Sequence, residues 1–225
     1  MHQGTLIVLE GPEGAGKSTQ ARRLLELLQS RGVPSVGVCE PGGTALGEEI
    51  RRLLLHDPSR SMSDAAEALL FMASRAELVD EVIAPSLGAG KVVVLDRFFL
   101  STYAYQVAGR GLPEEEVRRA NALATRRLTP DLTLVLSVPS GHRRLRASLR
   151  GAPDRIEEAG DPFHTRVEQA FAAFLSPEWQ ASHPECGPIS AVDGDGTEDE
   201  VFARILGALS QRWPETFPAM DESHR

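Results

Sequence analysis

A glycine-rich string stands directly behind a short apolar run near the start of the chain. Residues 11–18 read GPEGAGKS, and TLIVLE at 5–10 precedes them. A loop that binds phosphate must present several backbone N–H groups to one anion and must open into a helix whose N-terminus adds positive potential. The string has the spacing G-x-x-x-x-G-K-[ST] of such a loop, and QARRLLELLQ behind it has helical periodicity. The sequence therefore predicts a phosphate loop between a buried strand and a helix.

The positions of this loop have different expected roles. Lys17 can reach the β- and γ-phosphates of a nucleotide, and the Ser18 hydroxyl can ligate Mg²⁺. The residues expected to hold the nucleotide are Gly11, Pro12, Glu13, Gly14, Ala15, Gly16, Lys17, Ser18 and Thr19.

A second GAGK string, at residues 88–91, fails the same test. Pro85 stands where the first glycine would be, Val92 replaces the hydroxyl, and a strand-like VVVLDR follows. We therefore expect a turn from a helix to a strand. Lys17 and Lys91 are the only two lysines among 24 lysines and arginines, and the compact ammonium at Lys17 suits a phosphate loop.

Apolar runs at 5–9, 33–38, 92–95, 132–138 and 189–192 alternate with longer helical patterns. This alternation is typical of βαβ units and a parallel sheet. We expect an α/β fold with a five-stranded parallel sheet flanked by helices, in a single domain over residues 1–211. The end of the chain, residues 212–225, contains two prolines and no periodicity and is expected to be a loosely held tail.

Charge and hydropathy narrow the function classes. The net charge of −8 argues against a general nucleic-acid binder, which usually needs a basic face. No apolar run approaches the ~20 residues that cross a bilayer, so we expect a cytoplasmic protein without a membrane partner. The N-K-x-D motif of guanine-binding GTPases is absent from the chain.

A kinase of small phosphorylated acceptors needs a second anion site that faces the loop. The string VVVLDR ends a predicted strand at Asp96 and Arg97, which places both at the carboxyl edge of the sheet, where α/β proteins bind ligands. Asp96 could hold Mg²⁺ and Arg97 could bind an acceptor phosphate. The alternative is an ion pair at the end of a strand.

Five strings, in this order and spacing, carry a resemblance to a known family: LEGPEGAGKST, EPGGT, FMASRAE, LDRFFLSTYAYQ and RGAPDRIEE. They closely resemble the bacterial thymidylate kinases, which transfer the γ-phosphoryl group of ATP to dTMP. The resemblance runs from about residue 5 to 206. It implies a P-loop nucleoside monophosphate kinase fold with a short arginine-rich lid at about 143–160, ATP and Mg²⁺ as cofactors, and a homodimer formed through helices within residues 44–88 and 98–108.

The resemblance also implies how the thymine base is held. Phe71 should stack on the ring and Arg75 should hydrogen-bond its O4. Residues four apart on a helix share a face, which lets a ring and a donor meet one base. Without the resemblance, Phe71 would be taken as core and Arg75 as a surface charge. Ser101 and Thr102 should contact the N3 side of the base.

Other acceptor contacts follow from the same resemblance. Tyr105 should crowd the 2′ position of the sugar, and Gln106 completes its helical face. Glu13 should face the 3′-hydroxyl group, the alternative being a solvated loop carboxylate. Glu40 and Pro41 should belong to a loop that closes over the nucleoside, with Arg51 and Arg97 directed at the acceptor phosphate. The chain departs from the family pattern at Cys39, where many relatives carry arginine, and at Phe98, where tyrosine or histidine is frequent.

The phosphate loop contains no arginine that could stabilise the transition state. The segment HRRLRASLRGAPDRIEE instead offers several, with Gly151 and Pro153 breaking the helix. We expect a lid that closes on ATP, with Arg146, Arg150 and Arg155 as its catalytic arginines. The alternative is a basic helix face exposed to solvent. The full set of expected catalytic residues is Lys17, Asp96, Arg97, Arg146, Arg150 and Arg155, and the expected metal ligands are Ser18 and Asp96.

The predicted function is thymidylate kinase. Two alternatives stay open at this point: a P-loop kinase of another nucleotide or nucleoside, and a non-catalytic ATP-binding regulator.

Overall fold

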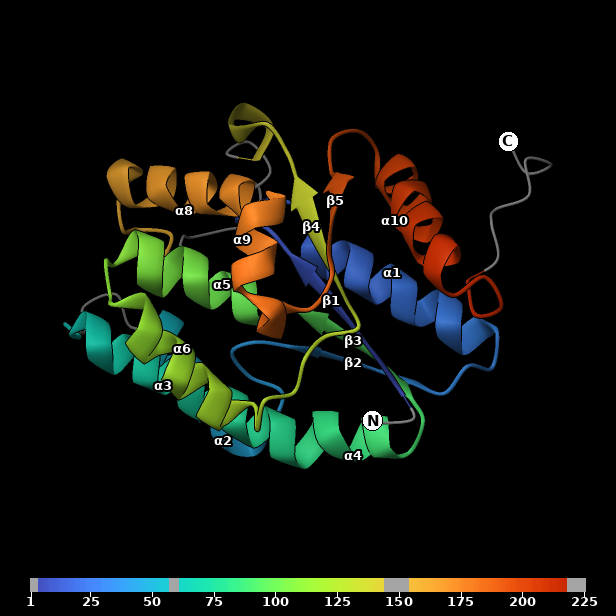
Figure 1. Ribbon diagram of the computed structural model, residues 1–225, viewed down its shortest axis with the longest axis horizontal. Coiled ribbons are helices and arrows are strands. Elements are labelled where there is room, and N and C mark those ends of the chain that lie inside the picture. Colours follow the sequence, from blue (N-terminus) through green and yellow to red (C-terminus); the bar gives the residue numbers. More distant parts are fainter. Residues whose placement is uncertain (1–3, 57–60, 144–153, 218–225) are drawn as a thin grey trace.

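Five strands form one parallel sheet in the order β2-β3-β1-β4-β5 (Figure 1). The computed structural model describes residues 4–56, 61–143 and 154–217. Each strand lies within about two residues of a predicted apolar run, and the predicted fold class is confirmed. The strands are β1 Thr5–Glu10, β2 Ser35–Cys39, β3 Val92–Asp96, β4 Leu132–Ser137 and β5 Ile189–Asp193.

Helices connect the strands and cover both faces of the sheet. None of those in the described ranges is long and apolar enough to cross a membrane. The α-helices are α1 Lys17–Ser30, α2 Ala45–Leu55, α3 Asp64–Leu78, α4 Ala84–Gly88, α5 Phe99–Thr102, α6 Glu114–Ala124, α8 Asp161–Ala173, α9 Pro177–Ser182 and α10 Glu198–Arg212. Two π-helical segments, η1 Val79–Ile83 and η2 Tyr103–Gly109, continue α3 and α5, and η3 Pro184–Cys186 is a 3₁₀ turn.

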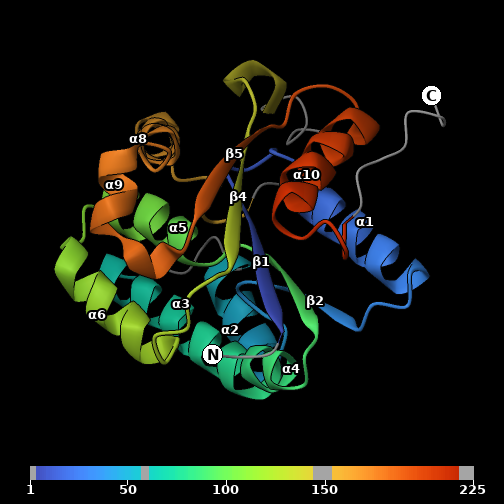
Figure 2. The same cartoon turned by 45° about the vertical axis from the view of Figure 1, so that its right-hand side comes forward.

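The apolar strands supply two cores because successive side chains of a strand point to opposite faces. Leu6 and Val8 of β1 pack into one buried cluster with α2, η1 and η2. Ile7 and Leu9 pack into the other, with α1 and α10. Figure 2 shows α1 and α10 together on one side of the sheet and the remaining helices on the other. Burial on both faces explains why the strand sequences read as continuous apolar runs.

The second GAGK string is a helix-to-strand turn, as predicted. Helix α4 ends at Gly88, Gly90 has a left-handed φ of 74°, and β3 begins at Val92. The EPGGT string likewise leads into a helix, since Thr44 caps α2 by accepting a hydrogen bond from the Gly47 N–H at 2.9 Å.

The prediction of a loosely held tail from residue 212 is wrong for residues 213–217. Phe217 is 1% exposed and packs in the same cluster as α1 and α10. Its N–H donates to the carbonyl of Trp213 at 2.8 Å. This stretch has no helical periodicity, but burial of the Trp213 and Phe217 rings against the core holds it in place.

Candidate active site

The phosphate loop joins the end of β1 to the first residue of α1, in the predicted strand–loop–helix context. Gly14 and Gly16 have left-handed φ angles of 75° and 93°. A Cβ at Gly14 would lie 2.6 Å from the carbonyl oxygen of Arg143, so only glycine fits there. Gly16 lies directly before the N-terminus of α1. Apart from its chain neighbours, no atom of residues 4–56, 61–143 and 154–217 lies within 4 Å of a Cβ built at Gly16.

Lys17 is buried and reaches back across the loop. Its Nζ donates to the carbonyl of Pro12 at 2.9 Å. Burial, together with the nearby positive charge of Arg97, lowers the pKa of Lys17 to about 8. A phosphate in the loop would add further negative charge beside this buried ammonium, to that of Asp96, Glu13 and Glu10.

Asp96, at the end of β3, meets the first turn of α1. The Ser18 hydroxyl donates to Asp96 Oδ2 at 2.5 Å. The other carboxylate oxygen, Oδ1, is buried and has no hydrogen-bond partner among the described residues. A buried carboxylate oxygen without a donor is costly unless a cation or water meets it.

Glu10, the last residue of β1, fixes the turn that follows β3. Its buried carboxylate accepts hydrogen bonds from the N–H groups of Phe98 and Ser101 at 2.7 and 3.0 Å, and from the Ser101 hydroxyl at 2.7 Å. Arg97 in this turn has a φ of 73°, a strained value for a residue with a side chain. The Glu10 contacts hold the turn, and with it the direction of the Arg97 side chain.

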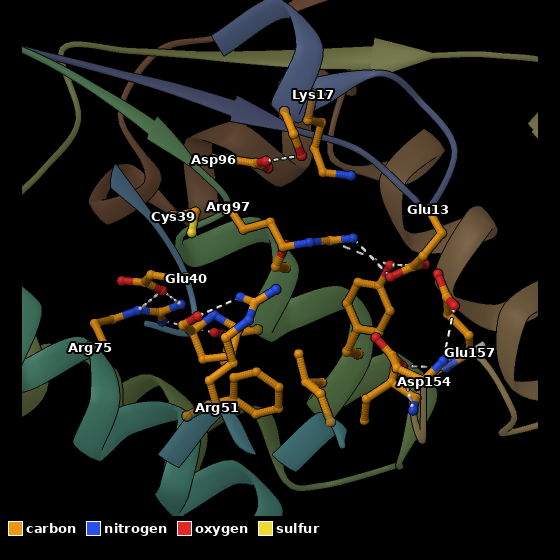
Figure 3. Close-up of a pocket in the computed structure, with 18 of the residues that line it drawn as sticks. Glu13, Lys17, Cys39, Glu40, Arg51, Arg75, Asp96, Arg97, Asp154 and Glu157 are labelled. Carbon is orange, nitrogen blue, oxygen red and sulfur yellow. Dashed lines mark hydrogen bonds and ion pairs between the residues drawn. The ribbon is translucent and has the colours of Figure 1, made fainter. Parts of the chain in front are cut away.

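A cavity of about 310 Å³ opens at this edge of the sheet (Figure 3). It borders the phosphate loop, the strand ends and helices α2, α3 and η2, and its size is at the lower end for small-molecule sites. All eleven residues predicted to contact the acceptor line it: Glu13, Glu40, Pro41, Arg51, Phe71, Arg75, Arg97, Ser101, Thr102, Tyr105 and Gln106. Lys17, Ser18 and Asp96 line the same cavity, so one space joins both predicted anion sites.

Glu13, Arg97 and Tyr105 form a charged cluster within this cavity. Arg97 pairs with Glu13 at 2.8 Å and lies with its Cζ 5.2 Å from the centre of the Tyr105 ring. The Tyr105 hydroxyl donates to the second Glu13 oxygen. Burial would raise the pKa of Glu13, but the positive charges of Arg97 and Lys17 prevail and lower it. Glu13 is therefore a paired carboxylate and not a solvated loop residue.

Arg75 is 2% exposed, which excludes the surface-charge alternative. Its guanidinium donates to Glu40 Oε2 from Nε and Nη2 at 2.7 and 2.5 Å. The remaining N–H groups donate to Thr102 Oγ1 at 2.8 Å, Asn121 Oδ1 at 2.6 Å and the Phe98 carbonyl at 2.9 Å. All five donors of this side chain are thus engaged within the protein. Glu40, expected in a closing loop, is instead the buried partner of Arg75.

The other side of the cavity is framed by α2 and the loop before it. Arg51 donates to the carbonyl of Pro41 at 2.6 Å, and Cys39 lines the cavity as a free thiol. Phe98 is fully buried, with its ring centre 5.0 Å from Cζ of Arg75. Phe71 is half-buried between the apolar core and the cavity.

Only some of the arginines predicted in the lid lie within the described residues, and these bind different partners. Arg146 and Arg150 lie outside the described residues. Arg155 donates to the Leu54 carbonyl at 2.8 Å and to Glu67 at 2.7 Å. Arg143 is buried, donates to the Val138 carbonyl at 3.0 Å, and pairs with Glu168 of α8.

Sequence reasoning missed several residues of the site. Asp154, Ile156 and Glu157 line the cavity although only Arg155 was selected from their string DRIE. Leu55 lines the cavity as well, and Glu10 holds the turn after β3 that carries Arg97. The apolar Ile156 between charged neighbours was an available signal, because an isolated apolar residue in a charged segment indicates a buried position.

A family model described as thymidylate kinase matches residues 9–183. The chain belongs to the thymidylate kinase family. It is 43% identical over 212 residues to a thymidylate kinase of Deinococcus radiodurans, covering 94% of this chain and 99% of the relative. It is 46% identical over 209 residues to a thymidylate kinase of a Synechococcus species, covering 92% and 95%. These matches confirm the predicted family and support its activity over the two alternatives.

The fold agrees with a solved structure of the same family. The thymidylate kinase from Ehrlichia chaffeensis superposes with a TM-score of 0.71 at 28% identity, covering 92% of this chain and 98% of that one. The thymidylate kinase fold therefore extends over nearly the whole chain, including the elements that surround the cavity.

Proposed function

We propose that this protein transfers the γ-phosphoryl group of ATP to dTMP, giving dTDP and ADP. The observation that carries the proposal is the single cavity that joins the phosphate loop to all eleven expected acceptor residues. In-line transfer breaks the bond between the γ-phosphorus and its bridging oxygen and forms a bond to a phosphate oxygen of dTMP. Proximity and charge neutralisation supply the rate enhancement, and no covalent intermediate on the protein is needed.

The phosphate loop would hold ATP. The N-terminus of α1 and the loop N–H groups face the phosphates, and Lys17 neutralises the charge on the β- and γ-phosphates. The left-handed φ of Gly16 and its place directly before α1 support this assignment.

Mg²⁺ would bind between Ser18 and Asp96. The buried Asp96 Oδ1 without a partner fits a hard cation, directly or through water. Among residues 4–56, 61–143 and 154–217, no group of three or more His, Cys, Asp or Glu side chains could form a cage. This agrees with a cation that takes one or two protein ligands and completes its coordination with phosphate oxygens and water. Bound there, the ion would neutralise charge on the transferred group.

dTMP would occupy the rest of the cavity. Phe71 would stack on thymine, and Thr102 and Ser101 would meet its polar edge, with Arg75 beside them. Arg97 and Arg51 would bind the acceptor phosphate. Since Arg75 has every donor engaged, a hydrogen bond to O4 requires it to share a donor or release a partner.

The sugar would lie between Glu13 and Tyr105. Burial raises the pKa of Tyr105 well above its usual value, so its hydroxyl stays protonated and holds the Glu13 carboxylate. Glu13 would accept a hydrogen bond from the 3′-hydroxyl, while the Tyr105 ring would exclude a 2′-hydroxyl. We retain Arg146 and Arg150 as the proposed transition-state arginines of the lid.

A homodimer formed through residues 44–88 and 98–108 stays part of the proposal. Leu46 of α2 and Leu69 of α3 are 50% and 62% exposed, and both lie in the proposed interface. A light-scattering mass near 24.4 kDa would contradict the dimer. A cytoplasmic location likewise remains a proposal.

Product analysis tests the proposed reaction. The protein is incubated with ATP, Mg²⁺ and dTMP, and nucleotides are separated by anion-exchange chromatography. We expect dTDP and ADP in equal amounts. Lys17→Ala, as the matched control, should remain folded and lose roughly 10²–10³-fold in turnover. ADP without dTDP, or equal rates in both proteins, would refute the proposal.

A further inference from the structure

Glu67 of α3 is a buried carboxylate to which side chains from two other segments are bound. It is 1% exposed. Gln106 of η2 donates to its Oε1 at 3.2 Å, and Arg110 donates to Oε1 and Oε2 at 3.1 and 2.9 Å. Arg155 donates to Oε2 at 2.7 Å. Four N–H donors therefore meet one carboxylate, beside the acceptor part of the cavity.

The charge on this carboxylate is maintained by its partners. Burial would raise the pKa of Glu67, but the hydrogen bonds from Arg110, Arg155 and Gln106, together with the charge of Arg110, prevail and lower it. Glu67 thus stays ionised at neutral pH. A paired buried carboxylate of this kind is costly to disrupt, because either partner alone would be left as an uncompensated charge.

Arg155 ties a wall of the cavity to this carboxylate. Arg155 is also hydrogen-bonded to the C-terminal end of α2. Its backbone N–H donates to the Leu55 carbonyl at 3.3 Å, and its Nε donates to the Leu54 carbonyl. Its neighbours Asp154, Ile156 and Glu157 line the cavity, and Figure 3 shows Asp154 and Glu157 across the cavity from Glu40 and Arg75.

Gln106 gives Glu67 a second connection to the cavity. Its side chain lines the cavity while its Nε2 donates to Glu67. The carboxylate therefore fixes two wall segments, one from η2 and one from residues 154–157. These segments lie far apart in the sequence, and Glu67 is the contact they share.

We propose that Glu67 is a positioning residue for the acceptor and that Arg155 acts through it, holding residues 154–157 as a wall of the acceptor site. The inference rests on the proposed function, because the acceptor is taken to be dTMP. It assigns Arg155 a role in acceptor affinity, in place of the expected neutralisation of the transferred phosphoryl group. The two roles predict opposite kinetic effects, since one changes binding and the other changes turnover.

Calorimetric titration with dTMP in the absence of ATP, followed by steady-state kinetics, tests the inference. Arg155→Leu and Glu67→Gln should each weaken dTMP binding by about tenfold, with kcat at saturating dTMP within about twofold of wild type. Arg155→Lys can still pair with Glu67 and should recover part of the affinity. In the double variant Glu67→Gln/Arg155→Leu, the loss should match the larger single loss, because both remove one interaction.

Arg110→Leu is the matched control. Arg110 also pairs with Glu67, but its chain neighbours do not line the cavity as those of Arg155 do. Its loss should therefore lower the melting temperature and leave dTMP affinity within about twofold. Unchanged affinity in Arg155→Leu, or a fall in its kcat with unchanged affinity, would overturn the inference. If Glu67→Gln does not fold, the two Arg155 variants still decide.

Failure of the proposed function would be separately visible. If wild-type protein neither binds nor phosphorylates dTMP but accepts another monophosphate, the same variants are titrated with that acceptor. The positioning role is supported if Arg155→Leu binds that acceptor more weakly than wild type while Arg110→Leu does not. It is refuted if the two variants have the same affinity for that acceptor.

Discussion

Glu13 of the phosphate loop and Arg97 at the end of β3 form an ion pair 2.8 Å long across the cavity. The pair links the two anion sites, because Glu13 belongs to the loop proposed for ATP and Arg97 to the site proposed for the acceptor phosphate. An arriving acceptor phosphate must therefore share Arg97 with Glu13. In the proposed function, the same carboxylate accepts a hydrogen bond from the 3′-hydroxyl of the sugar.

Glu13→Ala should lower kcat/KM for dTMP by ~10–100-fold, the usual range for losing a hydrogen bond to a charged group. With 3′-deoxythymidine monophosphate, which lacks the 3′-hydroxyl, the variant and wild type should differ much less. Steady-state kinetics with both acceptors measures the ratio. Equal losses for both acceptors would show that Glu13 does not read the 3′-hydroxyl.

The lowered pKa of Glu13 predicts how acidity acts on the site. Because its folded-state pKa lies below the unfolded value, its contribution to stability is present above ordinary glutamate pKa values and is lost as the pH falls through the folded value. Glu13 should therefore add no step to the pH dependence of KM for dTMP between pH 7 and about 5, a range in which the dTMP phosphate itself titrates with a pKa of about 6. Steady-state kinetics of wild type and Glu13→Gln across this range measures it, and a step present in wild type and missing in Glu13→Gln would contradict the prediction.

Lys17 predicts a change on the alkaline side. Its pKa of about 8 in the free protein means that the amine loses its charge as the pH rises through that value. Since kcat/KM reports the free enzyme, kcat/KM for ATP should fall above about pH 8. A pH profile of kcat/KM for ATP, at dTMP concentrations well below its KM, measures this limb. A profile that is level to about pH 9.5, near the usual lysine value, would contradict the assignment.

Tyr105 should control the choice of sugar. Tyr105→Ala removes the ring beside Arg97 and opens space at the 2′ carbon, so activity with ribothymidine monophosphate should rise relative to dTMP. Tyr105→Phe retains the ring and loses the hydrogen bond to Glu13, so it should retain the preference for deoxyribose. If the ratio of activity with ribothymidine monophosphate to activity with dTMP is the same in wild type and Tyr105→Ala, the ring does not select the sugar and serves only in packing.

Arg75 should be essential to stability as well as to binding. Arg75→Leu leaves the carboxylate of Glu40 buried and unpaired, and should lower the free energy of unfolding by ~3–5 kcal/mol. Urea denaturation measures the loss. Arg22→Leu, which breaks the exposed Arg22–Glu26 pair of α1, is the control and should cost less than about 1 kcal/mol. Similar losses in both variants would refute the buried-cluster account.

The fold was predictable because its signals are local. Each strand is an apolar, β-branched run bounded by turn residues, and the phosphate loop is a contiguous string with fixed glycine positions. The family resemblance placed most of the cavity residues, since all but Cys39, Arg51 and Leu55 lie within a quoted motif. Phe71 and Arg75, four apart on α3, both line the cavity as expected of one helical face.

What sequence reasoning missed depends on contacts between distant segments. Glu67 meets Arg155, 88 residues away, and Arg75 meets Asn121, 46 residues away. Nothing in the local pattern around Asn121 indicates that its amide faces a buried guanidinium. Arg143 and Arg155 belong to the same arginine-rich string, yet they bind different partners. Arg143 donates to the Glu13 carbonyl of the phosphate loop, and Arg155 donates to the Glu67 carboxylate. Composition indicates a basic segment but does not determine which carboxylate each arginine meets.

The measurement that tests the assigned reaction most directly is a coupled ADP-release assay with ATP, Mg²⁺ and a panel of acceptors: dTMP, dUMP, dCMP, dAMP, dGMP, UMP and thymidine. Membership of the thymidylate kinase family predicts the highest kcat/KM for dTMP. The closed 2′ position at Tyr105 and the acceptor phosphate at Arg97 predict weak activity with UMP and thymidine. A higher kcat/KM for any other acceptor, or no acceptor-dependent ADP release, would contradict it.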